Sequence, residues 1–128
     1  IADAFSLGDL QTWRDSFLVV VTETSGNTGP DLPFITEKTF KPMIGKRPFI
    51  VMGPSNANTV LQNMGFATFE DLVTPETLAD FISDTDAEQC TALYNQFRER
   101  IEHNYAHFYA YKHQLIAQYS FLDSLLLV

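Results

Sequence analysis

Two short apolar runs, separated by a polar stretch, most constrain the fold of this chain. The first covers residues 17–21 (FLVVV), and the second covers residues 48–52 (PFIVM), which Gly53 and Pro54 stop. Continuous β-branched and aromatic runs of this length are typical of strands buried on both faces of a parallel sheet. A helix is predicted between them over residues 39–44, ending near Gly45, so the order predicts a β-α-β unit.

Turn and cap residues define the next two elements. Ser55 or Asn56 can cap a helix that runs through Met64, with Gly65 after it in the left-handed conformation. Residues 66–69 are expected to add a short third strand. We therefore predict an α/β fold, a single Rossmann-like three-layer domain over residues 1–128 with a short parallel sheet, right-handed crossovers and extra C-terminal helices.

Two helices are predicted in the C-terminal part of the chain. The first starts at residues 74–76, with Pro75 in its first turn, and a capping box at residues 85–88 (TDAE) opens a longer second one. We expect this second helix to bend near residues 104–108. The expected apolar positions are Leu78, Phe81 and Ile82 on the first helix and Leu93, Phe97, Ile101, Tyr105 and Phe108 on the second.

Composition limits the partners that suit this protein. The chain of 128 residues is 45% hydrophobic and carries a net charge of −8, which disfavours binding to a nucleic-acid backbone because that needs clustered cations. Five of the eight Lys and Arg residues nevertheless fall within the first 47 positions, at Arg14, Lys38, Lys41, Lys46 and Arg47. A locally basic pocket in an acidic protein suits a small anionic ligand.

The single cysteine and the lack of long apolar runs bear on the expected location. Cys90 has no second cysteine with which to form an intrachain disulfide or a cysteine-built metal site, which fits a reducing compartment. The longest apolar run near the end, residues 125–128, is far below the roughly 20 residues that span a bilayer. No secretory signal is recognisable, so we expect a cytoplasmic protein without a membrane span.

Polar side chains cluster at the edge where the two predicted strands and the intervening helix meet. In a parallel sheet, ligands bind beyond the carboxyl ends of the strands. Cations and backbone N–H groups suit a diphosphate, and a carboxylate can hold ribose hydroxyls. The expected ligand-binding residues at this edge are Glu23, Thr24, Ser25, Thr36, Glu37, Lys38, Thr39 and Lys41.

Some of these residues have a second interpretation. Glu23 is either a donor-site ligand or general base, or a carboxylate that caps the adjacent loop. For Glu37 and Lys38 the alternative is a solvated helix start, with the acid near the positive end of the helix dipole. Lys46 and Arg47 lie at the opposite strand end and are expected in solvent.

The segments at this edge resemble the nucleotide-sugar half of GT-B glycosyltransferases. The matching stretches are residues 22–25 (TETS), 34–40 (FITEKTF) and 48–54 (PFIVMGP), within residues 17–70. They are closest to the fucosyltransferase-like pattern, in which a strand ending in Glu and Ser precedes TEK and an apolar strand ending in Gly. They are also similar to phage and bacterial proteins of unassigned activity that carry TEKT-x-KP and PFI segments.

The resemblance implies a function and roles for individual residues. The chain would be the C-terminal, donor-binding half of a two-domain glycosyltransferase, with a nucleotide sugar as substrate and the acceptor domain and catalytic base elsewhere. Lys38 would act as the catalytic cation on the diphosphate, and Glu37 would hold the ribose, without a required metal. The alternative function is a non-catalytic α/β binding or interaction module.

The predicted long helix contains a histidine pair and an aromatic cluster, neither of which is assigned a catalytic role. His103 and His107 share a spacing of four residues that zinc ligands also use, but no third ligand is evident, so we predict no metal site. An aromatic cluster is expected mainly to pack in the core, with a partner surface as the alternative. Its members are Tyr105, Phe108, Tyr109, Tyr111, Tyr119 and Phe121.

Overall fold

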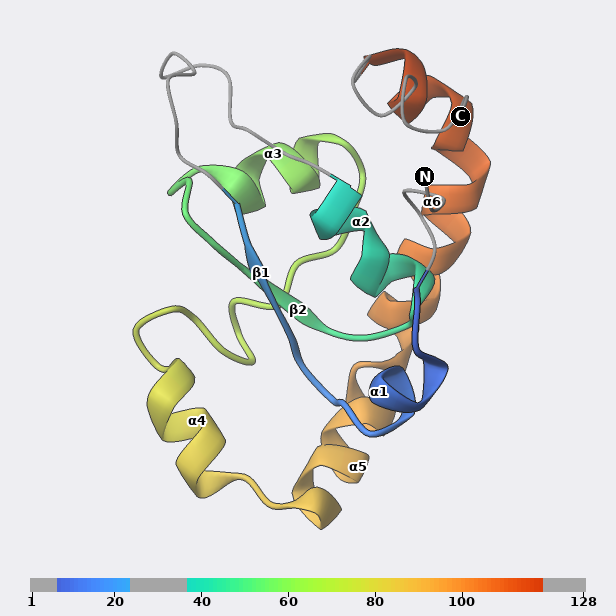
Figure 1. Cartoon of the computed structure of the whole chain (residues 1–128). Helices are drawn as coiled ribbons and strands as arrows, with labels where there is room; N and C mark the ends of the chain where they lie inside the picture. Colours follow the sequence, from blue (N-terminus) through green and yellow to red (C-terminus); the bar gives the residue numbers. More distant parts are fainter. Residues whose placement is uncertain (1–6, 24–36, 119–128) are drawn as a thin grey trace.

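The computed structural model describes residues 7–23 and 37–118 of the chain. These residues form six helices and a two-stranded parallel sheet on which helices pack (Figure 1). The elements, in chain order, are α1 (Leu10–Arg14), β1 (Val19–Thr22), α2 (Glu37–Ile44), β2 (Phe49–Met52), α3 (Ala57–Asn63), α4 (Leu78–Asp84), α5 (Ala87–Gln96) and α6 (Arg98–Gln118).

The predicted β-α-β unit is present. β1 and β2 pair in parallel, with Val19 opposite Phe49 and Thr22 opposite Met52, and α2 connects them. The α/β class with a short parallel sheet and further C-terminal helices is therefore confirmed. The predicted starts of both strands were slightly early, because the ladder begins only at Val19 and Phe49.

The two strands differ in how much of their surface is covered. In β2, Phe49, Ile50 and Val51 are all buried, as the sequence predicts. In β1, Val21 is buried but Val20 is 44% exposed. The prediction that both strands are buried on both faces is thus right for β2 and wrong for β1, whose alternate residues face outward.

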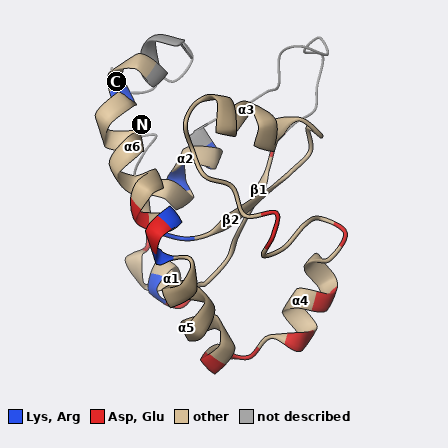
Figure 2. Ribbon diagram, turned by 180° about the vertical axis from the view of Figure 1, so that it is seen from behind, with Lys and Arg blue, Asp and Glu red and all other residues tan. Residues whose placement is uncertain are grey.

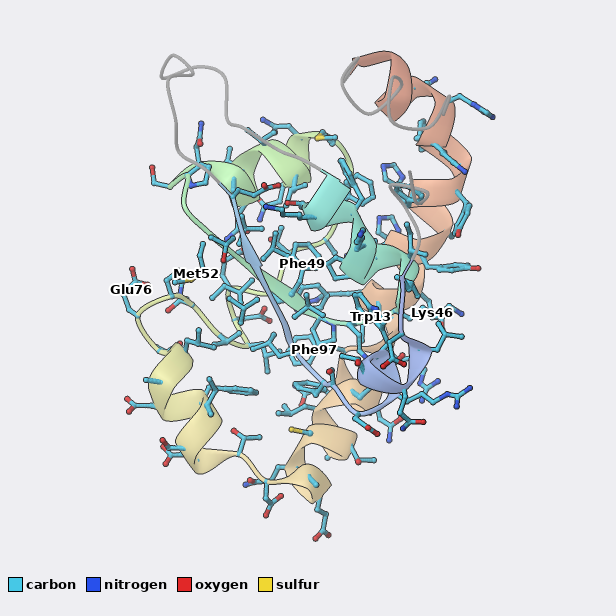
Figure 3. The ribbon with its side chains drawn as sticks, viewed as in Figure 1. Trp13, Lys46, Phe49, Met52, Glu76 and Phe97 are labelled. Atoms are coloured by element: carbon cyan, nitrogen blue, oxygen red, sulfur yellow. The ribbon has the colours of Figure 1, made fainter. Side chains whose placement is uncertain are left out.

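The core lies between one face of the sheet, α2 and α6. Phe40 of α2 is fully enclosed, and its ring lies 5.9 Å from that of Phe66 and 5.8 Å from that of Phe108 on α6. A second aromatic chain runs from Phe49 through Phe69 to Phe97, with ring centroids 5.5 and 6.0 Å apart. Figure 3 shows Phe49 and Phe97 pointing into this interior. These rings join α2, β2 and α6 within one buried core.

The predicted third strand at residues 66–69 is absent. The backbone there is irregular, and Ala67 pairs with a side chain instead of a strand. The Ala67 N–H donates to Asn104 Oδ1 at 2.8 Å, and Asn104 Nδ2 donates to the Ala67 carbonyl at 3.0 Å. One amide group on α6 therefore takes both hydrogen bonds that a neighbouring strand would have taken, and Asn104 is only 2% exposed.

The boundaries of the C-terminal helices depart from the predictions. A capping box is present one residue later than predicted, with Asp86 and Gln89 as its partners. The break falls at Phe97, between α5 and α6, whereas α6 runs without interruption through residues 104–108, where we expected a bend. Phe97 is buried against Phe69, so packing rather than local sequence sets the break.

The helix predicted from residue 74 starts later than expected. Residues 75–77 form a turn in which the Thr77 hydroxyl oxygen accepts a hydrogen bond from the Thr74 N–H at 2.8 Å, and α4 begins at Leu78. Such side-chain bonds to nearby backbone compete with helix formation. Ile82, predicted to face the core, is 65% exposed. α4 lies on the side of the strands away from α6 (Figure 1).

The apolar stripe predicted for the long helix is largely confirmed. Phe97, Ile101 and Phe108 are buried, and Leu93 and Tyr105 are partly buried. The two tyrosines that follow, Tyr109 and Tyr111, are exposed. Tyr119 and Phe121, the remaining members of the predicted aromatic cluster, lie outside the described residues.

His103 and His107 join α6 to the end of α3. Gly65 follows that helix with φ of +94°, as predicted for a left-handed residue. His103 Nε2 donates to the Gly65 carbonyl at 2.8 Å and His107 Nε2 to the Met64 carbonyl at 2.7 Å. Because carbonyls only accept hydrogen bonds, Nε2 carries the proton in each ring. Both histidines therefore satisfy backbone groups that a helix end leaves open.

We predict that Asn104→Ala lowers the free energy of unfolding by about 2 kcal/mol, because both polar groups of Ala67 lose their partner inside the protein. Urea denaturation followed by circular dichroism measures this. Asn63→Ala, at an exposed position at the end of α3, is the matched control and should change stability by less than about 0.5 kcal/mol. Equal effects of the two substitutions would contradict the assignment.

A pH-dependent contribution is expected from Asp71. Arg100 donates to both of its carboxylate oxygens at 2.7 Å and thereby holds the pKa of Asp71 below its ordinary value. A carboxyl group whose pKa is lower in the folded than in the unfolded state stabilises the protein above a pH of about 4. This stabilisation is lost as the pH falls through the pKa of the folded state. Both side chains are substantially exposed, so we expect Asp71→Asn to cost at most about 1 kcal/mol at pH 7.

Urea denaturation at pH 7, 5 and 3 tests this expectation. The difference between the wild type and Asp71→Asn should shrink at pH 3, where the carboxyl group is protonated in the unfolded chain. Asp80→Asn on the exposed surface of α4 is the control. A difference that stays constant over this pH range would show that the ion pair is not its source.

Candidate functional site

Glu23 and Thr39 form the centre of the carboxyl edge of the sheet. Glu23 follows β1, and its backbone N–H extends the ladder by donating to the Met52 carbonyl at 2.9 Å. Its side chain is 4% exposed, and Thr39 Oγ1 in the first turns of α2 donates to Glu23 Oε2 at 2.7 Å. Because Thr39 is itself fully buried, this bond lies inside the protein. It fixes the beginning of α2 against the end of β1.

Gly53 lets the two strand ends approach closely. Its φ is +129°, and a Cβ at this position would overlap the backbone carbonyl of Glu23. Only glycine adopts this conformation without a steric penalty. The Gly53-Pro54 pair that ends the second apolar run thus has a packing reason, which is to bring the end of β2 next to Glu23.

The structure places only part of the predicted ligand set. Lys38 is exposed and lies in the first turn of α2, directly before Thr39, and Lys41 is half-buried one turn later. The backbone of Glu37 is helical, but its side chain lies outside the described part. Thr24, Ser25 and Thr36 lie wholly outside the described residues. Of the predicted residues, the structure joins Glu23 and Thr39, and Lys38 directly precedes Thr39 in the chain.

A cavity of about 420 Å³ opens at the carboxyl end of β2. Met52 and Glu76, which both line it, lie side by side in Figure 3. Its other polar lining residues are Ser55, Asn58 and Thr74. Among the described residues that line it there is no lysine or arginine, and neither Glu23 nor Lys38 is one of them. This cavity offers hydroxyl, amide and carboxylate groups of the kind that bind sugar or ribose hydroxyls.

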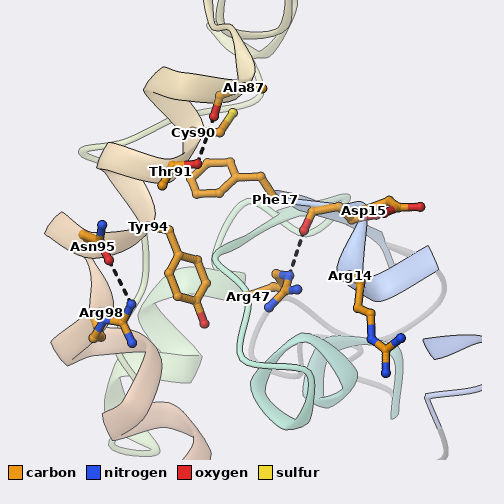
Figure 4. A pocket seen from close by; sticks show the side chains of 11 residues that line it. Arg14, Asp15, Phe17, Arg47, Ala87, Cys90, Thr91, Tyr94, Asn95 and Arg98 are labelled. Atoms are coloured by element: carbon orange, nitrogen blue, oxygen red, sulfur yellow. Dashed lines mark hydrogen bonds between the residues drawn. The ribbon is translucent and has the colours of Figure 1, made fainter. Parts of the chain in front are cut away.

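A larger cavity, of about 570 Å³, lies at the amino end of β1, away from the predicted site (Figure 4). Three arginines line it: Arg14 of α1, Arg47 before β2, and Arg98 of α6. No pattern in the sequence predicts this arrangement, because the α5–α6 region that supplies Arg98 is brought to α1 only by the tertiary fold.

Arg47 is not in solvent, contrary to the prediction. Its guanidinium donates to the Trp13 carbonyl at 2.7 Å and to the Ser16 carbonyl at 2.7 Å. The carbonyls at the end of a helix such as α1 lack partners within the helix and favour a cation. Lys46, also expected in solvent, pairs with Glu102 at 3.2 Å. Arg47 thus fixes the end of α1 against the start of β2, and Lys46 forms a partly exposed ion pair with α6.

Cys90 lines the larger cavity but is not an activated nucleophile. Burial raises the pKa of its thiol, and the negative charge of Asp86 adds to this effect. The thiol is therefore protonated at neutral pH, whereas a reactive cysteine needs a lowered pKa. Covalent chemistry at Cys90 is thus disfavoured.

Neither a metal-binding cluster nor a membrane-spanning helix is present in residues 7–23 and 37–118. No group of three or more His, Cys, Asp or Glu side chains there could hold a metal ion, and none of the helices has the length and apolar character needed to cross a bilayer. Comparison with known protein families, curated proteins and solved structures gave no match. The function is therefore inferred from the geometry at the ends of the sheet.

We predict that Thr39→Val lowers the free energy of unfolding by about 2 kcal/mol, because the buried Glu23 carboxylate loses a hydrogen bond and valine cannot replace it. Urea denaturation at pH 7 measures the change. Thr22→Val, at an exposed position one residue before Glu23, is the matched control and should stay within about 0.5 kcal/mol of the wild type. A loss no larger than that of the control would contradict a structural role for this bond.

Proposed function

We propose that this chain is the nucleotide-sugar donor-binding domain of a glycosyltransferase of the GT-B type and forms its C-terminal half. The observation that carries the proposal is the bond between Glu23 and Thr39. It holds the first turn of α2, where Lys38 is exposed, at the carboxyl edge of a parallel sheet. That edge is where α/β folds bind nucleotides.

The proposed mechanism is electrostatic. Lys38, with Lys41 one turn later, stabilises the negative charge that develops on the nucleoside diphosphate as the sugar leaves. Glu37 accepts hydrogen bonds from the ribose hydroxyls, and Thr24, Ser25 and Thr36 supply hydroxyl groups nearby. Lysines and backbone amides can take the charge-neutralising role that a metal has in other transferases. The general base comes from the acceptor-binding domain.

Glu23 has a positioning role in this proposal. Its carboxylate is enclosed and bonded to Thr39, so it acts on α2 rather than on a substrate. A fixed first turn keeps the backbone of Lys38 in place at this edge, which supports the preorganisation on which electrostatic stabilisation depends. The bond to α2 is a role that neither interpretation of Glu23 from the sequence had named.

Exposed apolar side chains lie on two elements of this domain. Val20 of β1 and Ile82 of α4 are 44% and 65% exposed. An acceptor-binding domain of the same enzyme is the partner that the proposal requires. The same exposure also suits the second candidate function, a non-catalytic α/β module that binds another protein.

Thermal unfolding in the presence of nucleotides tests the proposal. At 100 times its dissociation constant a ligand stabilises a fold by about 2.7 kcal/mol, which raises the melting temperature by roughly 10 °C. We expect one of UDP, GDP, ADP or CMP, or a sugar conjugate of it, to produce such a shift. Lys38→Ala and Glu37→Ala should each reduce it strongly.

The controls separate this site from the rest of the molecule. Arg98→Gln removes a positive charge at the other end of β1 and should leave the nucleotide shift unchanged. A shift that survives both Lys38→Ala and Glu37→Ala would contradict the assigned site. No shift with any nucleotide, in a protein that melts cooperatively, would favour the interaction module instead.

A further inference from the structure

The outer edge of β1 is open in the described part of the chain. On the inner side of β1, the Val19 N–H donates to the Pro48 carbonyl and the Glu23 N–H donates to the end of β2. Because successive residues of a strand turn their backbone groups to opposite sides, those of Val20 and Thr22 point away from β2. No group among the described residues forms a hydrogen bond with them on that side. They form a short row of free N–H and C=O groups.

The cover on the outer face of the sheet stops short of β1. Val20 pairs in register with Ile50, so the two side chains lie on the same face of the sheet. Ile50 is 5% exposed, whereas Val20 is 44% exposed and Thr22 is exposed as well. β1 is therefore open both along its outer edge and on this face.

The residues that usually protect a strand edge are missing from β1. Exposed edges commonly carry a lysine, a proline or a β-bulge, each of which prevents another strand from pairing. Residues 16–22 (SFLVVVT) contain no charged residue and no proline, and the ladder with β2 is regular. Figure 2 shows both strands without charged residues, whereas α4 carries acidic ones. The edge of β1 thus has the character of one that another strand covers.

We propose that β1 pairs antiparallel with β1 of a second copy of this chain, about a two-fold axis at Val20. Val20 of each copy then exchanges N–H···O bonds with Val20 of the other. Leu18, two residues earlier, turns its backbone groups to the same side and bonds with Thr22 of the second copy. The contact joins the two-stranded sheets of both copies into a single sheet. It does not depend on the proposed transferase function.

The edge is complementary to itself. In a two-fold contact the same surface serves on both sides, so the association is closed and stops at the dimer. Val20 faces Val20 across the axis, and Thr22 faces Leu18. Apolar and β-branched cross-strand pairs of this kind stabilise a sheet, and no like charges face each other because residues 16–22 carry none.

The charge of the chain predicts how salt affects the contact. Each copy has a net charge of −8, so two copies repel each other at long range, and added salt screens this repulsion. The dimer should therefore become tighter as sodium chloride increases. Binding of a basic peptide to the same edge would show the opposite dependence.

Sedimentation velocity over a range of protein concentrations tests the proposal. A contact of one short strand is smaller than the roughly 1,200 Å² of a stable interface, so we expect a reversible dimer that is populated mainly at about 100 µM and above. The proportion of dimer should rise with protein concentration and, at a fixed concentration, with sodium chloride.

Two pairs of variants locate the contact on the edge of β1. Thr22→Pro removes an N–H that points away from β2, which an edge strand tolerates, and should raise the dissociation constant at least about tenfold. Thr22→Val keeps this N–H and should keep the dimer. Val20→Lys places like charges opposite each other and should weaken the dimer to a similar extent. Ile82→Lys, at an exposed apolar position on α4, is its control and should not.

Amide hydrogen exchange followed by NMR gives a second readout at single residues. The N–H groups of Val20 and Thr22 should exchange at least about threefold more slowly in a concentrated than in a dilute sample, because only the dimer bonds them. The N–H of Val21, which points to β2 in either state, should change less.

Three results would overturn the proposal. The first is a monomer at every protein and salt concentration, which would leave the edge to a strand of a different protein. The second is a dimer that Thr22→Pro and Thr22→Val retain equally. The third is a dimer in which the exchange of Val20 and Thr22 does not slow. Melting temperatures establish that each variant is folded before its association is measured.

Discussion

The fold depends on α2 being held between the sheet and α6. A parallel sheet of two strands with four residues each cannot bury enough surface to be stable alone. Phe40 fills the space between β1, residue 66 and Phe108, while the Thr39–Glu23 bond fixes the same helix to the end of β1. Phe40 is the apolar anchor of α2 and Thr39 is its polar anchor. Because these two residues are adjacent, core packing also sets the position of the candidate site.

Side chains on helices replace the backbone pairing that a larger sheet would supply. Asn104 bonds both polar groups of Ala67, His103 and His107 bond the last carbonyls of α3, and Arg47 bonds those of α1. In the described part of the chain no buried side-chain nitrogen or oxygen lacks a partner. A small core with irregular connections is stable only under this condition, because an unpaired buried polar group costs about 1–3 kcal/mol.

The elements that local chemistry determines were predictable from the sequence. The β-α-β unit, Gly65 and the apolar stripe of α6 follow from hydrophobic runs, a left-handed residue and helical spacing. Tertiary contacts decided the rest: Asn104 displaced a third strand from residues 66–69, and packing of Phe97 moved the expected bend. At the candidate site, the segment of residues 37–39 was predicted as a turn before the helix, and the structure makes it the first turn of α2 itself. The buried bond of Thr39 and the cavity lined by three arginines were missed, because each joins residues far apart in the chain.

The charge distribution explains why the candidate site suits a small anion rather than a polymer. Lys38 and Lys41 lie at one end of the sheet and three arginines line the cavity at the other, in a chain whose net charge is −8. A nucleic acid or an acidic protein would have to cover carboxylates along with these cations and would be repelled. A phosphate on a small molecule meets only the local positive potential, and at physiological salt the field of distant carboxylates is screened within about 8 Å. Selection of the ligand at the carboxyl edge then depends on its organic part, because hydroxyl, amide and carboxylate groups line the cavity near β2.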